Sequence, residues 1–147
     1  MGTQRKQRSN CKACNKLLSS LKTIYCDNVC QGAFHFNNYI ERWKRGEESG
    51  SDANGELNSR IKKYIRNKFS NKCFHCNWNE VNPATGTSPL AVDHIDGNFT
   101  NNVESNLRLL CPNCHSLTPT YGALNTGFGR PRRRKQYISD RSSMVES

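Results

Sequence analysis

The sequence predicts a small α+β fold assembled from two units, and three observations support this prediction. The chain has 147 residues, close to the usual size of one domain, and only 34% of them are hydrophobic. An ordinary globular chain contains roughly 45–50% apolar residues, so a single large apolar core is not expected. Eight cysteines fall in four close pairs, and strand and helix patterns lie beside these pairs. Something other than apolar burial therefore holds the fold together.

The charge balance of the chain indicates which class of partner it binds. Twenty-two Lys and Arg residues against 12 Asp and Glu residues give a net charge of +10. Such a balance favours a polyanion, most often nucleic acid, although a basic protein with no particular partner is the alternative. No stretch approaches the roughly 20 apolar residues of a membrane span, and the N-terminus has no apolar signal core. We therefore expect no membrane partner and a cytoplasmic location.

The cysteine spacing is the most specific pattern in the chain. Three pairs read C-x2-C and one reads C-x3-C. Two thiolates on a tight knuckle can hold one tetrahedral ion, and a second knuckle completes a four-sulfur site. Disulfides are rare in a reducing compartment, so two structural Zn²⁺ ions are favoured over disulfides or a redox pair. The two expected sites are Cys11, Cys14, Cys26 and Cys30, and Cys73, Cys76, Cys111 and Cys114.

Residues 1–45 are expected to form the first unit, a zinc knuckle followed by a helix. The apolar stretch 17–24, between the two cysteine pairs, suits a ribbon or hairpin. After Cys30, apolar residues recur at helical spacing as far as Trp43. Residues 46–56 are rich in Gly, Ser and acidic side chains, which predicts a linker or a long loop.

Residues 57–69 predict an amphipathic helix at the start of a second unit, residues 57–126. Leucine, isoleucine and aromatic side chains form one stripe, and basic side chains cover the rest. The basic face either lies on the phosphates of a nucleic acid or is an ordinary solvated face. The residues proposed for phosphate contact are Lys62, Lys63 and Arg66.

A hairpin and a second knuckle are expected further along this unit. Residues 90–95 form a strand that ends in an Asp-Gly turn, and an Asn-rich loop follows. Residues 106–110 form a second strand, and the knuckle 111–115 opens a helix. Because a hairpin this small is not stable alone, zinc would fix its geometry.

The tail 127–147 is basic and is expected to be disordered when free. It contacts nucleic acid either through phosphates alone or as an AT-hook, because Gly-Arg-Pro at 129–131 precedes further arginines. The tail residues assigned to this contact are Arg130, Arg132, Arg133, Arg134 and Lys135.

The second unit resembles a known family. The resemblance is to the HNH motif of ββα-metal nucleases, which is similar to the residues VDHIDGN…NN…NLRLLCPNCHSLT of this chain. The segment WNEVNPATG lies upstream of them. It most resembles the small free-standing HNH endonucleases of phage genomes that carry zinc-binding cysteines. The resemblance implies a zinc-stapled, treble-clef-like ββα-metal unit with an N-terminal zinc knuckle and helix. It covers most of the chain and is strongest over residues 61–125.

This resemblance also implies roles for four residues. His94 would be the general base, and Asp93 and His115 would hold a catalytic Mg²⁺ or another divalent ion. Asn106 would orient the hairpin and the base, or else bind the metal itself. The residue types fit the chemistry, because imidazole titrates near neutral pH and a hard cation offsets phosphate charge.

The expected activity is hydrolysis of DNA to 5′-phosphate and 3′-hydroxyl ends. One active site per chain implies nicking, unless two chains act together as a homodimer. The alternative is a non-catalytic, zinc-dependent DNA-binding module, and an RNA nuclease would share the same motif. If the protein is phage-encoded, the location is the cytoplasm of the host cell.

Overall fold

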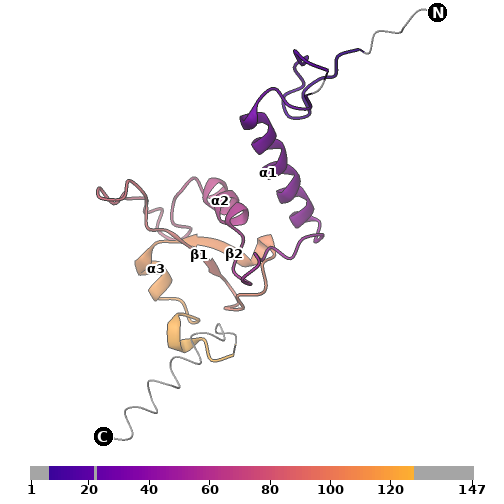
Figure 1. The fold of residues 1–147 in the computed structure, drawn as a ribbon. Coiled ribbons are helices and arrows are strands. Elements are labelled where there is room, and N and C mark those ends of the chain that lie inside the picture. Colours follow the sequence, from indigo (N-terminus) through magenta and orange to yellow (C-terminus); the bar gives the residue numbers. More distant parts are fainter. Residues whose placement is uncertain (1–6, 22, 128–147) are drawn as a thin grey trace, which may run out of the picture. The chain divides into compact units, whose positions relative to one another are not determined.

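The computed structural model describes residues 7–21 and 23–127, which fall in two compact units (Figure 1). The first unit is Met1–Glu48 and the second is Ser49–Ser147. The arginine-rich run of the expected tail lies outside the described residues. None of the described helices combines the length and apolar character of a membrane span.

The first unit consists of a cysteine knuckle and the helix α1, Asn28–Lys44. The helix begins before Cys30 rather than after it, because the Asp27 side chain caps it by accepting a hydrogen bond from the Cys30 N–H at 2.8 Å. Cys30 therefore lies in the first helical turn. In the stretch expected to form a ribbon, Leu17 makes an isolated bridge back to Asn10.

The second unit begins with an ordered loop and the helix α2, Ser59–Lys68. The loop closes on itself through an isolated bridge between Ser51 and Leu57. Within it, the Asp52 carboxylate accepts the backbone N–H groups two and four residues further on. The apolar stripe of α2 is formed as expected, since Ile61 and Ile65 are fully buried.

Two short antiparallel strands form the sheet of this unit. They are β1, Ala91–His94, and β2, Leu107–Leu110, with the 3-10 helix η1, Glu104–Asn106, directly before β2. The register pairs Asp93 with Arg108. The leucines of β2 provide the apolar core together with the buried residues of α2.

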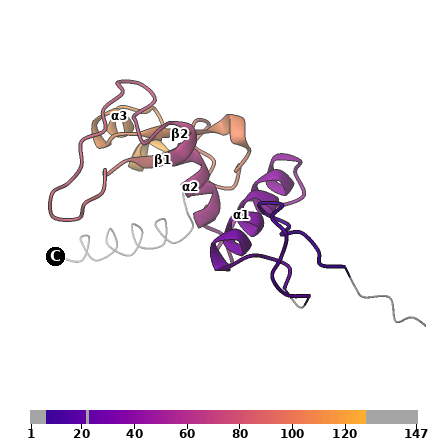
Figure 2. The same ribbon diagram turned by 90° about the horizontal axis from the view of Figure 1, so that it is seen from above.

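The helix α3, Pro112–Ser116, follows β2 directly, and the 3-10 helix η2, Gly122–Leu124, ends the described chain. Both α2 and α3 contact both strands, and the sheet lies between the two helices in two orthogonal views (Figures 1 and 2). The sequence of strand, loop, strand and helix is the expected one. The predicted fold class, a small α+β protein with two four-cysteine groups, is confirmed.

Candidate functional site

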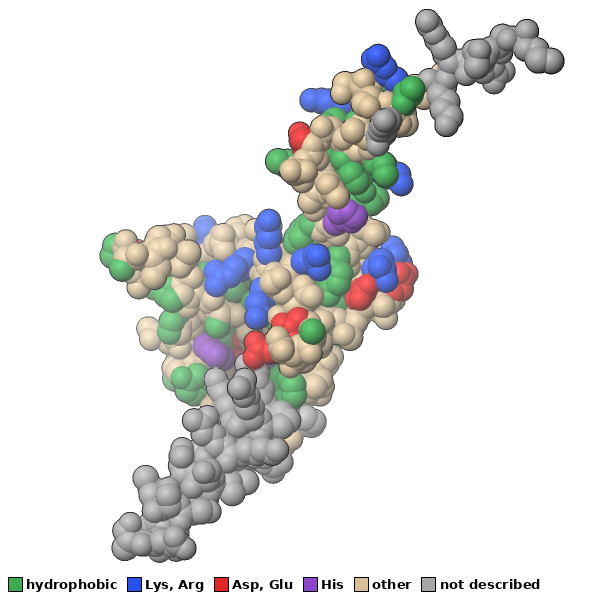
Figure 3. All heavy atoms as spheres, viewed as in Figure 1, with side chains coloured by type: hydrophobic (Ala, Val, Ile, Leu, Met, Phe, Trp, Pro, Cys, Tyr) green, Lys and Arg blue, Asp and Glu red, His purple; other side chains and the backbone are tan. Residues whose placement is uncertain are grey.

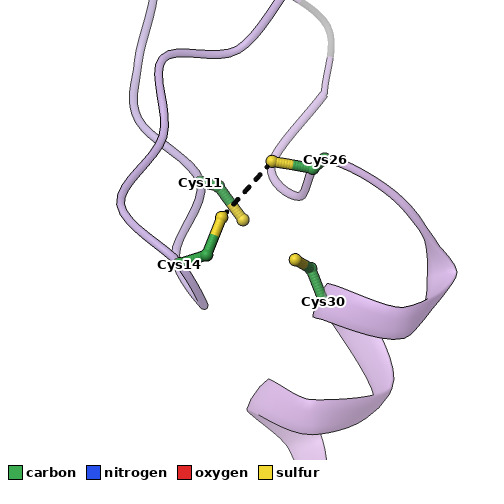
Figure 4. A group of neighbouring side chains, drawn as sticks. All are labelled: Cys11, Cys14, Cys26 and Cys30. Carbon is green, nitrogen blue, oxygen red and sulfur yellow. Dashed lines mark hydrogen bonds between the residues drawn. The ribbon is translucent and has the colours of Figure 1, made fainter.

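The first cysteine group joins the N-terminal knuckle to the start of α1. Its four sulfurs lie within 4.8 Å of one another, and those of Cys14 and Cys26 are 3.5 Å apart (Figure 4). Four sulfurs at about 2.3 Å from a tetrahedral Zn²⁺ would be about 3.8 Å apart. The thiols are free rather than paired as disulfides. This group therefore fits a zinc ion, as predicted.

The second group repeats this arrangement beside the sheet. The sulfurs of Cys76 and Cys111 are 3.7 Å apart, and all four sulfurs again lie within 4.8 Å. Cys111 is the N-cap of α3, and its sulfur accepts the Cys114 N–H at 3.4 Å. Because Cys111 also follows β2 directly, a bound zinc would fix the angle between this strand and the helix.

The thiol pKa values indicate how each group would receive a cation. Burial raises the pKa of Cys11 and of Cys73, but backbone N–H groups outweigh it and lower both values to about 6. Conversely, burial raises the pKa of Cys30 to about 12, while the Cys111 thiol and burial raise that of Cys114 to about 12. The groups therefore hold protons that a divalent cation would displace on binding.

Two residues predicted to bind the catalytic ion lie together between β1 and α3. The Nε2 atom of His115 is 3.5 Å from Oδ1 of Asp93, whose side chain is only 6% exposed. An oxygen and a nitrogen at about 2.1 Å from one ion would be about 3.0–3.5 Å apart, depending on the coordination angle. The pair therefore fits a shared divalent ion. The described metal-ligand clusters of three or more residues are the two cysteine groups, and neither includes His115.

Arg108 is a neighbour of this pair that sequence reasoning missed. Its Nε donates to Oδ2 of Asp93 at 2.8 Å, and both side chains are largely buried. Its Nη1 lies 3.3 Å from Nε2 of His75. The guanidinium therefore balances the buried carboxylate and leaves Oδ1 facing His115. The strand register places Arg108 opposite Asp93, and no local sequence pattern specifies that register.

His94 directly follows Asp93, so their side chains point to opposite faces of the strand. Among the described hydrogen bonds and ion pairs, none joins the His94 ring to Asp93 or His115. Instead, its Nε2 lies 2.8 Å from Oδ1 of Asn102, which is buried. Asn102 was not singled out among the asparagines of this loop.

Asn106 is buried and closes the loop between the two strands. Its Oδ1 accepts the backbone N–H of Asp96 at 3.1 Å, and its Nδ2 donates to Oδ1 of Asp96 at 2.8 Å. Nδ2 also donates to the backbone oxygen of Asn101 at 2.8 Å. Burial raises the pKa of the Asp96 carboxyl, but hydrogen bonds from Asn101, Asn106 and the Asn98 backbone outweigh it and lower the pKa. The contacts of Asn106 thus hold the end of β1 against the start of β2.

The basic residues of α2 differ in their surroundings. The guanidinium of Arg66 donates to the backbone oxygens of Ser88 and Leu90, and therefore braces the segment that enters β1. Lys62 and Lys63 are exposed. Lys and Arg side chains gather over the part of the second unit that contains α2 (Figure 3).

Comparison with known proteins gives one informative relative. A 39-residue stretch, 26% of the chain, is 59% identical to the H-N-H endonuclease F-TflIV of Escherichia phage T5. The matched stretch spans 17% of the length of that relative. No protein-family model and no solved structure matches the chain. The resemblance to phage HNH endonucleases that the sequence predicted is therefore confirmed for a short segment.

Proposed function

We propose that this protein is a metal-dependent HNH endonuclease that hydrolyses phosphodiester bonds of DNA to 5′-phosphate and 3′-hydroxyl ends. The observation that carries the proposal is the pair of Asp93 and His115 at 3.5 Å, with His94 at the next position of β1. The short similarity to an H-N-H endonuclease of phage T5 supports the same class of activity.

Asp93 and His115 would hold Mg²⁺ or another divalent ion. When bound, such an ion offsets the charge that develops on the attacked phosphate and on the leaving oxygen. One carboxylate and one imidazole leave room for phosphate and water, as a catalytic site requires. Arg108 donates to Oδ2 of Asp93, so Oδ1 would remain available to hold the ion.

His94 would act as the general base. Its imidazole accepts a proton from the water that attacks phosphorus, as a positioned imidazole does in general base catalysis. Asn106 would act through its contacts with Asp96, which keep the end of β1 in place. The two zinc groups would be structural, because their four thiolates leave no open position.

DNA would be held through the basic residues of the second unit and the tail. The net charge of +10 supports a polyanionic partner, and Lys62 and Lys63 are exposed on α2. Arg66 would contribute indirectly, by bracing the entry to β1. The tail residues Arg130 to Lys135 would add phosphate contacts that weaken as salt rises.

The test is a supercoiled-plasmid assay on the purified full chain, with Mg²⁺ and with EDTA. We expect ion-dependent conversion to open-circular or linear DNA, reduced about 10²- to 10⁴-fold in His94→Ala, the range for loss of a general base. His35→Ala is the matched control, since His35 lies in the first unit and packs edge-on against Phe34. Binding of DNA by all three proteins without cutting under any divalent ion would instead support a zinc-dependent DNA-binding module.

A further inference from the structure

Asn102 connects the proposed base to a loop at the start of the second unit. Its Oδ1 lies 2.8 Å from Nε2 of His94, and its Nδ2 donates to Oγ of Ser51 at 3.0 Å and to the backbone oxygen of Ser49 at 3.4 Å. The side chain is only 3% exposed. These contacts join residues about 50 positions apart in the chain.

The Ser49 contact fixes which way the amide points. A backbone carbonyl can only accept a hydrogen bond, so the NH2 group of Asn102 must face Ser49. The amide oxygen then faces His94, and an oxygen can only accept. Nε2 of His94 therefore carries the hydrogen, and in the neutral ring the lone pair is on Nδ1.

We propose that Asn102 is a positioning residue for His94, which sets the orientation and the tautomer of the ring so that Nδ1 is the basic nitrogen. This rests on the proposed nuclease function, in which His94 accepts a proton. A buried amide held on both its oxygen and its nitrogen side resists rotation, so the ring it binds keeps a single orientation.

The loop that supports Asn102 is itself held in place. The backbone oxygen of Gly50 accepts the N–H of Asn58, the N-cap of α2, at 2.9 Å, and Ser51 bridges to Leu57. The segment predicted to be a linker or a long loop thus supplies the residues that hold Asn102 against the proposed base. Nδ2 of Asn102 donates to this loop, whereas Nδ2 of Asn101 donates to Asp96.

The direct test is the tautomer of His94 in the zinc-loaded full chain, read from long-range ¹H–¹⁵N correlation spectra at about pH 8, above the usual imidazole pKa. The chain has four histidines, so the His94 signal is assigned by its loss in His94→Gln. We expect the Nε2–H form in the wild type and a mixture of tautomers in Asn102→Ala. A wild-type Nδ1–H form, or an unchanged signal in Asn102→Ala, would overturn the proposal.

The kinetic test separates positioning from folding. Asn102→Ala should lower kcat for plasmid nicking roughly 10- to 100-fold, the range for partners that orient site side chains, with KM unchanged. In a His94→Ala background the same substitution should cost nothing further, because its effect passes through the ring. Val103→Ala, the exposed next residue, is the control and should leave kcat unchanged.

Ser51→Ala gives a milder variant that keeps Asn102 in place. It removes one acceptor of Nδ2 and keeps the Ser49 backbone oxygen, so it should lower kcat less than Asn102→Ala does, with the Nε2–H form partly retained. A loss of equal size for Asn102→Ala in both the wild-type and His94→Ala backgrounds would reduce Asn102 to a structural residue. If the wild type cuts no DNA while the tautomer result holds, the nuclease function fails and the assignment of the ring hydrogen stands.

Discussion

The two units use the same cysteine geometry but place different side chains around it. In each unit the second cysteine pair lies at the start of a helix, α1 or α3. In the first unit the nearest histidine, His35, packs against Phe34 in the middle of α1. In the second unit the helix start faces a strand that carries Asp93, and His115 approaches that carboxylate to 3.5 Å.

In the proposed nuclease, the four-cysteine group would be a scaffold and the sheet would supply the residues for the chemistry. A helix held by metal can present one histidine at a fixed place, but a metal-binding pair needs a second element opposite it. In the described part of the chain, paired strands of that kind occur in the second unit. Matched substitutions, one in each unit, test this difference between the units.

The largest effect is expected for the cysteines themselves. Cys73→Ser and Cys11→Ser should each reduce bound zinc from two ions to one, since each sulfur belongs to one group. A structural zinc site contributes about 10–16 kcal/mol in small zinc-binding peptides, so the altered unit should unfold. Cys73→Ser should abolish nicking, whereas Cys11→Ser should leave the second unit folded.

Native mass spectrometry would count the zinc ions, and hydrogen exchange resolved by peptide would identify the unfolded unit. Native-like protection of α2 and β2 in Cys73→Ser would contradict this prediction. Loss of that protection in Cys11→Ser would also contradict it, because the second unit is expected to fold without the first cysteine group.

A smaller effect is expected for the ion pairs. Arg108→Leu leaves the buried carboxylate of Asp93 without its cation and should cost about 3–5 kcal/mol of unfolding free energy. Arg42→Leu removes ion pairs with Glu47 and Glu48, whose side chains are far more exposed than those of Asp93 and Arg108, and should cost less than about 1 kcal/mol. Chemical denaturation, monitored by hydrogen exchange, measures the loss of unfolding free energy in both variants.

The double variant Asp93→Asn with Arg108→Leu provides the control for this pair. It removes the charge as well as its partner, and should recover part of the stability lost in Arg108→Leu alone. If Arg42→Leu and Arg108→Leu cost the same, burial is not what distinguishes the two ion pairs.

The contact between Arg108 and Asp93 also illustrates how much of the site the sequence could predict. The cysteine groups followed from spacing, and the helices from apolar periodicity, because both patterns are local. The partner of Asp93 depends on strand register across a loop of twelve residues, from 95 to 106, and no local pattern specifies it. Arg108 therefore appeared in the sequence only as a basic residue of a strand.

Asn102 was missed for a related reason. The loop contains Asn98, Asn101, Asn102 and Asn106, and their residue type is the same. Which of them turns inward depends on the turn after His94 and on a segment about 50 residues earlier. Composition predicted a linker or a long loop for that earlier segment and could not choose between them, because Gly, Ser and acidic residues form turns in ordered loops as well as in flexible ones. The contacts of Asn106 depend on the same turn and could not be predicted from the sequence. Its role in orienting His94 stays a proposal.

The turn after His94 gives the next prediction. Gly97 has φ +73°, and a Cβ placed there would lie 2.6 Å from Cγ2 of Thr120. Gly46, at the end of α1, has φ +78° and nothing within 4 Å of a Cβ. Strain at positive φ costs about 1–3 kcal/mol in both positions, but Gly97→Ala adds the clash and should cost more than Gly46→Ala.

Thermal unfolding of the two variants measures this difference. Thr120→Ser removes the methyl group that a Cβ at position 97 would meet first, so Gly97→Ala with Thr120→Ser should recover part of the difference. Equal costs for Gly97→Ala and Gly46→Ala would contradict the contact between the turn and the segment that contains Thr120.

The smallest effects are expected where the two units are alike. Asn58 caps α2 by accepting the Arg60 N–H at 2.9 Å, and Asp27 caps α1 by accepting the Cys30 N–H at 2.8 Å. Each substitution by Ala should cost about 1 kcal/mol, and Asn58→Gly only a few tenths of that. Asp27→Asn should be close to wild type, because Asn caps a helix as well as Asp does. Denaturation midpoints measured at saturating zinc would check these values. A much larger loss in Asp27→Ala than in Asn58→Ala would mean that this carboxylate supports the first cysteine group as well as the helix, and that the two knuckles are less alike than their sulfur geometry indicates.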